Sequence, residues 1–296
     1  MTLPERPPAG PEGPVTLPER PPAGPEGPRF LTAGGQPRAF VIVSSARSGS
    51  NLLVGYLRQL REAACFGEIL REDFVDRPGW QNLVGRLDMP KSACDLHATD
   101  LTSFWDLFLA QGLRRRRWLG AKAFYYHRRD DPVWERFAAL DHRIIHLWRD
   151  ATFEQYVSRL LAVASGEWKS PAGGRDDGTE ADGPADGEAH PDQATRVAFD
   201  RDDYLRYREA MRVDMEATRA RYAGNGRFVE VEYRQLLDHD FVGTLLEDLF
   251  GQHIDVTETL RRQRDRPKVD YLLNPAEAEP FVADSIVRGF APANGQ

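Results

Sequence analysis

The stretch Phe40-Val-Ile-Val-Ser-Ser-Ala-Arg-Ser-Gly-Ser-Asn-Leu-Leu53 decides the fold. Its apolar run from Phe40 to Val43 is typical of a strand buried on both faces, and the apolar residues that follow recur at helical spacing. Gly49 and Arg47 lie among small residues in the turn between the predicted strand and helix. Because glycine lets the backbone approach a ligand and a helix N-terminus favours a phosphate, the stretch predicts an anion-binding loop.

The side chains of this loop refine the expected ligand chemistry. Ser48, Ser50 and Asn51 add hydrogen-bond donors, and Arg47 supplies a fixed positive charge. A Walker A loop, G-x-x-x-x-G-K-[ST], requires a lysine before the helix, and this loop has none, so a magnesium-dependent NTPase loses support. An ordinary turn between a strand and a helix is the alternative, since serine and glycine are common in turns.

The rest of the chain alternates predicted strands and helices. Further strands are predicted at 118–124, 143–148 and 228–231, and helices near 152–164, 200–222, 240–250 and 256–263. This alternation predicts an α/β fold of three layers, with a central, mostly parallel sheet flanked by helices. Ligands are then expected at the C-terminal ends of the strands.

Two segments lack the hydrophobic pattern that is typical of a packed core. Residues 2–14 recur unchanged at 16–28, and ten of the first 28 residues are proline, which predicts a disordered tail over 1–28. Residues 170–192 hold seven acids against Arg175 alone, which predicts a mobile acidic insertion, either a lid or a solvated loop. The remaining sequence predicts a single domain over 38–290.

Charge and composition exclude several classes of protein. The net charge is −7, but the two segments carry −2 and −6, so the body is nearly neutral at +1. That charge does not suit duplex nucleic acid, although Arg114–Arg117 and the run Arg261–Lys268 suit a small anionic ligand. No stretch approaches the roughly 18 apolar residues of a membrane span, and no export signal is present, which predicts a soluble cytoplasmic protein.

Cysteine use agrees with a cytoplasmic location. Cys65 and Cys94 are the two cysteines of the chain and have no metal-ligand spacing. Free thiols in a reducing compartment are expected, with a single bridge between them as the alternative.

The loop Arg47-Ser-Gly-Ser-Asn51 resembles the 5′-phosphosulfate loop of the PAPS-dependent sulfotransferases, [KR]-S-G-[ST]-[STN]. PAPS is 3′-phosphoadenosine 5′-phosphosulfate. Arginine in the first position, followed by Leu-Leu-Val, is most similar to the bacterial carbohydrate and glycolipid enzymes of the trehalose 2-sulfotransferase type. The resemblance implies a P-loop-like fold, PAPS as co-substrate, adenosine 3′,5′-bisphosphate (PAP) as product, and no metal.

Later segments of the chain are similar to further motifs of the same family. An arginine after a strand and a serine on the next helix bind the 3′-phosphate in that family, and Arg149 and Ser158 match this pattern. An ion pair of Arg149 with a neighbouring acid is the alternative. The segment Glu232–Leu237 is similar to a Y-x-x-L motif, and the basic run with Arg264 and Arg266 is similar in position to a loop that closes over the 3′-phosphate.

The resemblance also implies catalytic residues. Glu68, in Cys65-Phe-Gly-Glu-Ile-Leu70, matches the family's catalytic glutamate and is expected to be the general base, provided that partial burial raises its pKa toward neutrality. Arg47 is expected to stabilise charge on the departing 5′-phosphate.

Other side chains compete for the role of base or are expected to contact the substrate. Imidazole titrates near neutral pH, so His97, His127 and His146 are rival bases, although His146 lies in a predicted buried strand. Lys122, Trp168 and His97 are expected contacts to the substrate.

The sequence therefore predicts a sulfotransferase that moves a sulfuryl group from PAPS to a hydroxyl of a carbohydrate, glycolipid or glycosylated natural product. A P-loop small-molecule kinase and a catalytically inactive nucleotide-binding homologue are the alternatives. The acceptor and its hydroxyl are not identified by the sequence. Related enzymes dimerise in some cases, so both a monomer and a homodimer fit.

Overall fold

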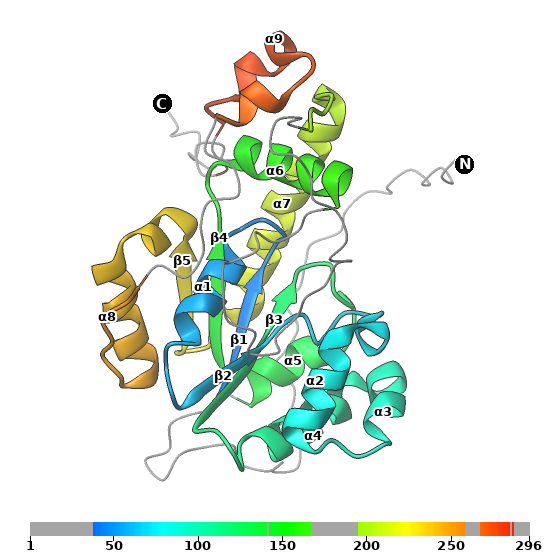
Figure 1. Ribbon diagram of the computed structural model, residues 1–296, viewed down its shortest axis with the longest axis vertical. Helices are drawn as coiled ribbons and strands as arrows, with labels where there is room; N and C mark the ends of the chain where they lie inside the picture. Colours follow the sequence, from blue (N-terminus) through cyan, green and yellow to red (C-terminus); the bar gives the residue numbers. More distant parts are fainter. Residues whose placement is uncertain (1–37, 141, 167–194, 258–266, 285, 287–296) are drawn as a thin grey trace, which may run out of the picture.

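A five-stranded sheet forms the centre of the protein (Figure 1). The computed structural model describes residues 38–140, 142–166, 195–257, 267–284 and 286. All pairs of neighbouring strands are parallel, in the order β2-β3-β1-β4-β5. The strands are β1 (Ala39–Ser44), β2 (Ala63–Phe66), β3 (Trp118–Phe124), β4 (Arg143–Trp148) and β5 (Phe228–Glu232). The predicted three-layer, P-loop-like α/β fold with a parallel sheet is confirmed.

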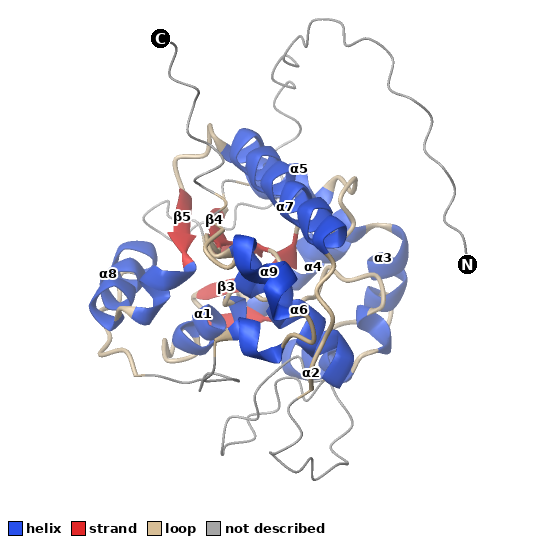
Figure 2. Cartoon of the chain, turned by 90° about the horizontal axis from the view of Figure 1, so that it is seen from above, coloured by secondary structure: helices blue, strands red, loops and turns tan. Residues whose placement is uncertain are grey.

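Helices cover both faces of this sheet, as the view from above shows (Figure 2). One face packs against α1 (Ser50–Leu57) and α8 (His239–Phe250). The other face packs against α2 (Pro78–Leu87), α4 (Leu101–Gly112), α5 (Val133–Ala139) and α7 (Arg201–Tyr222), with α3 (Ala93–Thr99) beside α4. A parallel sheet requires such cover because both of its faces are apolar.

The central strand β1 shows how the sequence produces two cores. All six of its residues are buried. Phe40 and Ile42 pack toward α1 and α8, whereas Val41 and Val43 pack on the opposite face. Gly120 in β3 makes room for Phe40, because a Cβ at Gly120 would lie 2.4 Å from the Phe40 carbonyl oxygen. Each large side chain buried in these cores stabilises the fold by roughly 1.5–3 kcal/mol.

A smaller hydrophobic cluster lies above the sheet in the view of Figure 1, where α6 (Thr152–Ser165) crosses the end of α7. Tyr156 and Tyr204 are fully buried in it. The short helix α9 (Pro275–Ala278) and the 3₁₀ turns η3 (Lys268–Tyr271) and η4 (Glu279–Phe281) close this end of the molecule. This cluster holds α6 against the carboxyl ends of the strands.

The predicted strands and long helices agree with the structure to within about two residues. The strand β2 and the helices α2 to α5 were not predicted from the sequence. Residues 1–28, the insertion 170–192 and most of the helix predicted over 256–263 lie outside the described residues. Within the described part of the chain, Cys65 is a buried free thiol and Cys94 an exposed one.

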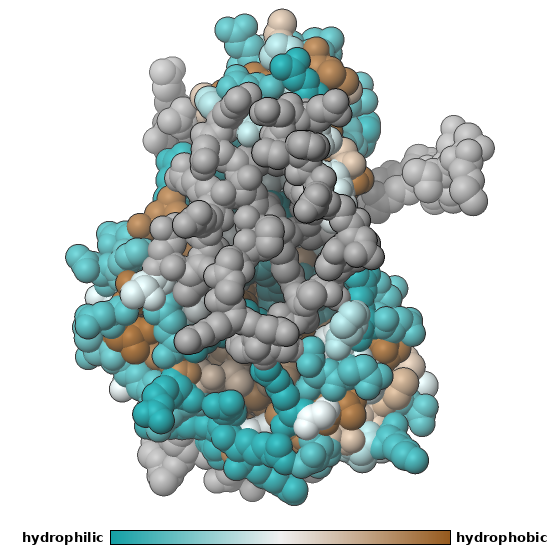
Figure 3. Space-filling view, viewed as in Figure 1, coloured by the Kyte–Doolittle hydropathy of each residue, from teal (hydrophilic) through white to brown (hydrophobic). Residues whose placement is uncertain are grey.

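The surface of the described residues is mainly hydrophilic on the face shown in Figure 3, with small apolar patches between charged side chains. Among the helices that the structure describes, none is both long and apolar enough to cross a membrane.

Four histidines lie in the interior and make folding sensitive to pH. Burial lowers the pKa of His142 to about 3 and that of His127 to about 4, and it also lowers the pKa values of His97 and His146. Between pH 7.5 and 5.5 the unfolded chain, with histidine pKa values near 6.5, gains protons that the folded chain does not bind. The free energy of unfolding therefore decreases as the pH falls through this range.

We predict that urea denaturation will show this decrease, with His142 alone contributing about 1.4 kcal/mol at pH 5.5. His142→Asn should lower stability at pH 7.5 but make the pH dependence shallower. His253→Asn is the control, because the His253 side chain is 65% exposed. Equal stability of the wild-type protein at pH 7.5 and 5.5 would contradict the prediction.

Candidate anion-binding and catalytic site

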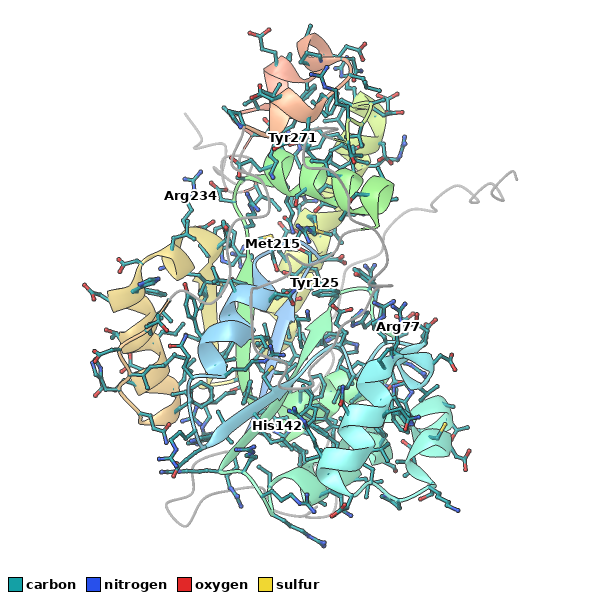
Figure 4. The ribbon with its side chains drawn as sticks, viewed as in Figure 1. Arg77, Tyr125, His142, Met215, Arg234 and Tyr271 are labelled. Carbon is teal, nitrogen blue, oxygen red and sulfur yellow. The ribbon has the colours of Figure 1, made fainter. Side chains whose placement is uncertain are left out.

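The expected functional residues gather at the carboxyl edge of the sheet. Register pairs Ser44 at the end of β1 with Phe124 at the end of β3 and with Leu147 near the end of β4. The segments that leave these strands therefore start side by side. Figure 4 shows Tyr125, the first residue after β3, at this edge, and His142, which precedes β4, toward the opposite end of the sheet.

The loop from β1 to α1 has the backbone of an anion-binding turn. Gly49 has a φ of 92° and forms the N-cap of α1, and Arg47 also lies in the left-handed region at 65°. The Ser48 hydroxyl donates to the Ser45 carbonyl oxygen at 2.8 Å, so Ser48 closes the loop internally. The amides of Ser50 and Asn51, the first two residues of α1, have no hydrogen-bond partner among the described residues and are available to a ligand, whereas those of Leu52 and Leu53 donate to the Gly49 carbonyl oxygen.

Helix α6 fixes the loop from the other side. Gln155 donates to the Ser45 hydroxyl at 2.5 Å and to the Ala46 carbonyl oxygen at 2.7 Å. Arg47 donates through Nε to the Ser158 hydroxyl at 3.0 Å. The two motifs that the sequence placed at separate phosphates, the loop and the strand–helix pair, are thus in direct contact.

Arg149 and Tyr233 complete this side of the site. The Arg149 guanidinium lies 4.6 Å from the centre of the Tyr233 ring and forms an ion pair with Glu154. The Arg149 side chain is only 11% exposed. Its Nε is buried and has no hydrogen-bond partner among the described residues. An anionic ligand at this position would satisfy that donor, since buried polar groups are rarely left unpaired.

Tyr233 contacts the loop as well as Arg149. A Cβ at Gly49 would lie 2.4 Å from the Tyr233 ring, so only glycine fits there. From the sequence, the segment Glu232–Leu237 indicates the fold more than the chemistry. Its position directly after β5 was the signal of a site residue, because the strand is parallel and ends at the same edge.

Lys122 joins the loop to the carboxylate of Glu68. Lys122 is only 3% exposed, and its Nζ lies 2.7 Å from Asn51 Oδ1 and 3.0 Å from Glu68 Oε1. Glu68 follows β2 directly, and β2 pairs with β3, which carries Lys122. The amide of Lys122 also donates to the Gly67 carbonyl oxygen at 3.1 Å. Neighbouring strands therefore hold this ion pair through their backbones.

The electrostatics of Glu68 differ from the sequence prediction. Burial raises the pKa of Glu68, but the positive charges of Lys122 and Arg71 and the proximity of His127 outweigh burial and hold the pKa below 4.5. Nη1 of the Arg71 guanidinium lies 3.1 Å from Glu68 Oε2. The expected rise toward neutrality was therefore wrong, because the sequence does not reveal the cations around the carboxylate. At neutral pH Glu68 is a carboxylate that can accept a proton.

Hydrogen bonding decides between Glu68 and His127 as the base. The amide of Phe124 donates to His127 Nδ1 at 3.1 Å, so the neutral ring carries its proton on Nε2. Nε2 faces Glu68 Oε2 at 3.9 Å. The pKa of His127 is lowered to about 4, chiefly by burial, so the ring stays neutral. In this tautomer Nε2 donates and does not accept, which leaves Glu68 as the proton acceptor.

The other two candidate histidines, His97 and His146, lie in the interior. His97 is fully buried among aromatic rings, and its Nε2 contacts the Ile69 carbonyl oxygen at 2.8 Å, so we leave it outside the site. His146 is a core residue, as the sequence indicated, and lies 2.7 Å from the Tyr125 hydroxyl and 2.9 Å from Glu230.

The basic run Arg114–Arg117 does not reach the site. Arg114–Arg117 precede β3 and lie at the amino edge of the sheet, opposite the site, so the anion-gathering role expected of them does not apply here. Arg115 pairs there with Asp88, and Arg117 with Glu62. Trp168, Arg264 and Arg266 lie outside the described residues.

No protein-family model matches the chain, and no curated protein matches it. Among solved structures, the chain is similar to a sulfotransferase from Alicyclobacillus acidocaldarius, with 17% identity over 85% of this chain and 94% of that chain, and a TM-score of 0.46. A functional assignment therefore depends on the residues of the site.

We predict that Gly49→Ala will destabilise the protein more than Gly251→Ala. Both glycines have a positive φ, which costs a residue with a Cβ about 1–2 kcal/mol. Only at Gly49 does the new Cβ also overlap a neighbour, the Tyr233 ring. Urea denaturation of both variants measures the difference, and equal destabilisation would show that Tyr233 does not contact the loop.

Proposed function

We propose that the protein is a PAPS-dependent sulfotransferase that transfers a sulfuryl group to a hydroxyl of a carbohydrate, glycolipid or glycosylated natural product. The observation that carries the proposal is the position of Lys122, whose buried ammonium contacts both the anion-binding loop and the Glu68 carboxylate. Sulfuryl transfer requires these two elements together: a site for an anionic donor and a base for the acceptor hydroxyl.

The donor fits the loop and the residues around it. The free amides at the start of α1, together with Arg47, form the proposed site of the 5′-phosphosulfate. The unpaired Nε of Arg149, near the start of α6, is the proposed donor to the 3′-phosphate, and Ser158 completes that site. Nucleotides that lack a 3′-phosphate should bind more weakly, since they leave the buried Arg149 Nε without a partner.

The chemistry requires only positioning, charge stabilisation and one base. The sulfur–oxygen bond to the acceptor oxygen forms as the sulfur–oxygen bond to the 5′-phosphate breaks, and PAP leaves with the bonding electron pair. The proton of the acceptor hydroxyl passes to Glu68. Arg47 stabilises the charge that collects on the 5′-phosphate, and because α6 already fixes its side chain, little reorganisation is needed.

The acceptor class and the cellular location rest on the family resemblance and on composition. The loop variant with arginine is similar to that of carbohydrate and glycolipid enzymes. A cytoplasmic location agrees with Cys65 and Cys94, which are both free thiols. The proposed enzyme is a single domain over 38–290 without a metal.

We predict that Glu68→Gln will lower kcat for transfer of ³⁵S from labelled PAPS by roughly 10²–10⁴-fold, because the amide does not accept the hydroxyl proton. PAP should still bind to this variant. A screen of sugars, glycolipids and glycosides supplies the acceptor, and Glu247→Gln, on the exposed face of α8, is the matched control. A Glu68→Gln enzyme with the wild-type rate would contradict the role of Glu68 as base.

A further inference from the structure

Lys122 is a buried ammonium group with capacity for one more partner. An ammonium has three N–H donors, and Asn51 and Glu68 accept two of them. Its Nζ also lies 5.1 Å from the centre of the Phe124 ring. Asn51 is the second residue of α1, and its amide and that of Ser50 have no hydrogen-bond partner among the described residues. An anion held by those amides therefore lies close to the third donor of Lys122.

Two cations and a neutral imidazole face Glu68 from the elements packed around it. Lys122 faces it from β3, Arg71 from the turn after β2, and His127 from the segment after β3. Arg71 is itself paired with Asp73, at 2.9 Å. Lys122 is the strongest of the favourable charges, and together these groups hold the pKa of Glu68 below its usual value despite burial. A carboxylate held in this way is a weak base.

A bound anion shifts the protonation equilibrium of Glu68 toward the protonated carboxyl group. Negative charge on the loop attracts the Lys122 ammonium. The flexible side chain of Lys122 allows this ammonium to move between Glu68 and the bound anion. The same negative charge repels the Glu68 carboxylate directly. Both effects favour protonation of Glu68, because a nearby like charge raises the pKa of a carboxyl group and a lost cation does the same. Among the described residues, Arg71 pairs with Glu68 and Asp73 and not with the loop, so it remains with Glu68.

We propose that Lys122 is a positioning residue that couples the anion-binding loop to the base, so that Glu68 becomes a strong proton acceptor only when the donor nucleotide occupies the loop. This inference rests on the proposed function and adds regulation to that site. Without the donor, Lys122 keeps the carboxylate weakly basic. Glu68 therefore deprotonates an acceptor hydroxyl only after the sulfuryl donor has bound.

The test is ¹³C NMR titration of the Glu68 carboxyl in protein labelled at glutamate Cδ, assigned with Glu68→Gln, with and without saturating PAP. In the wild-type protein PAP should raise the pKa of Glu68 by about 1 or more. In Lys122→Met the pKa should be higher from the start, and PAP should raise it less. Lys122→Arg, which keeps the charge, should restore part of the response.

Arg71→Met is the matched control, because Arg71 also contacts Glu68 but not the loop. That variant should raise the pKa of Glu68 in the free protein and leave the response to PAP intact. PAP binding by calorimetry without a change in the titration of Glu68 would overturn the coupling alone. An equal loss of response in Lys122→Met and Arg71→Met would also overturn it. Absence of PAP binding to the wild-type protein would overturn the proposed function and the coupling together.

Discussion

The buried ion pair between Lys122 and Glu68 is the interaction on which the arrangement of the site depends. Lys122 is 3% exposed, and breaking a buried pair by removing one partner typically costs 3–5 kcal/mol. Lys122 lies on β3 and Glu68 lies two residues after the end of the neighbouring strand β2, and the Lys122 amide donates to the Gly67 carbonyl oxygen beside Glu68. The β2–β3 register therefore determines where the carboxylate lies relative to the loop after β1.

Other contacts fix the loop itself. Gln155 and Ser158 attach it to α6, and Tyr233 packs against Gly49 from the end of β5. The helix α6 is held in turn by the apolar cluster that contains Tyr156 and Tyr204. Such support holds the site in place before a ligand binds, which is what catalysis by positioning and charge stabilisation requires.

The sequence predicted most of the sheet and the long helices, because their hydrophobic patterns are strong. It missed β2, whose four residues Ala63–Phe66 include no β-branched side chain and whose burial alternates. For the site, the loop from Arg47 to Asn51 and the segment from Arg149 to Ser158 were recognisable from local motifs.

The remaining features of the site depend on contacts between segments that are distant in the sequence. The surroundings of Glu68 were not predictable, because Lys122 and His127 reach it only through strand pairing. For the same reason, the excess effect of the cations over burial at this carboxylate was not predictable, and the expected direction of its pKa was wrong. The burial of His97 among the aromatic rings of α2 and α4 is also a tertiary property.

The central claim is that the loop and Arg149 together form a site for a nucleotide with a 3′-phosphate. Calorimetric titration of the protein with PAP, and separately with ATP and magnesium, tests this claim most directly. The predicted result is selective binding of PAP that is weakened about 10- to 100-fold in Arg149→Ala. Binding should not change in Arg206→Ala, the control on α7, because the Arg206 side chain is 70% exposed. Preferential binding of ATP with magnesium would contradict the claim and favour a kinase.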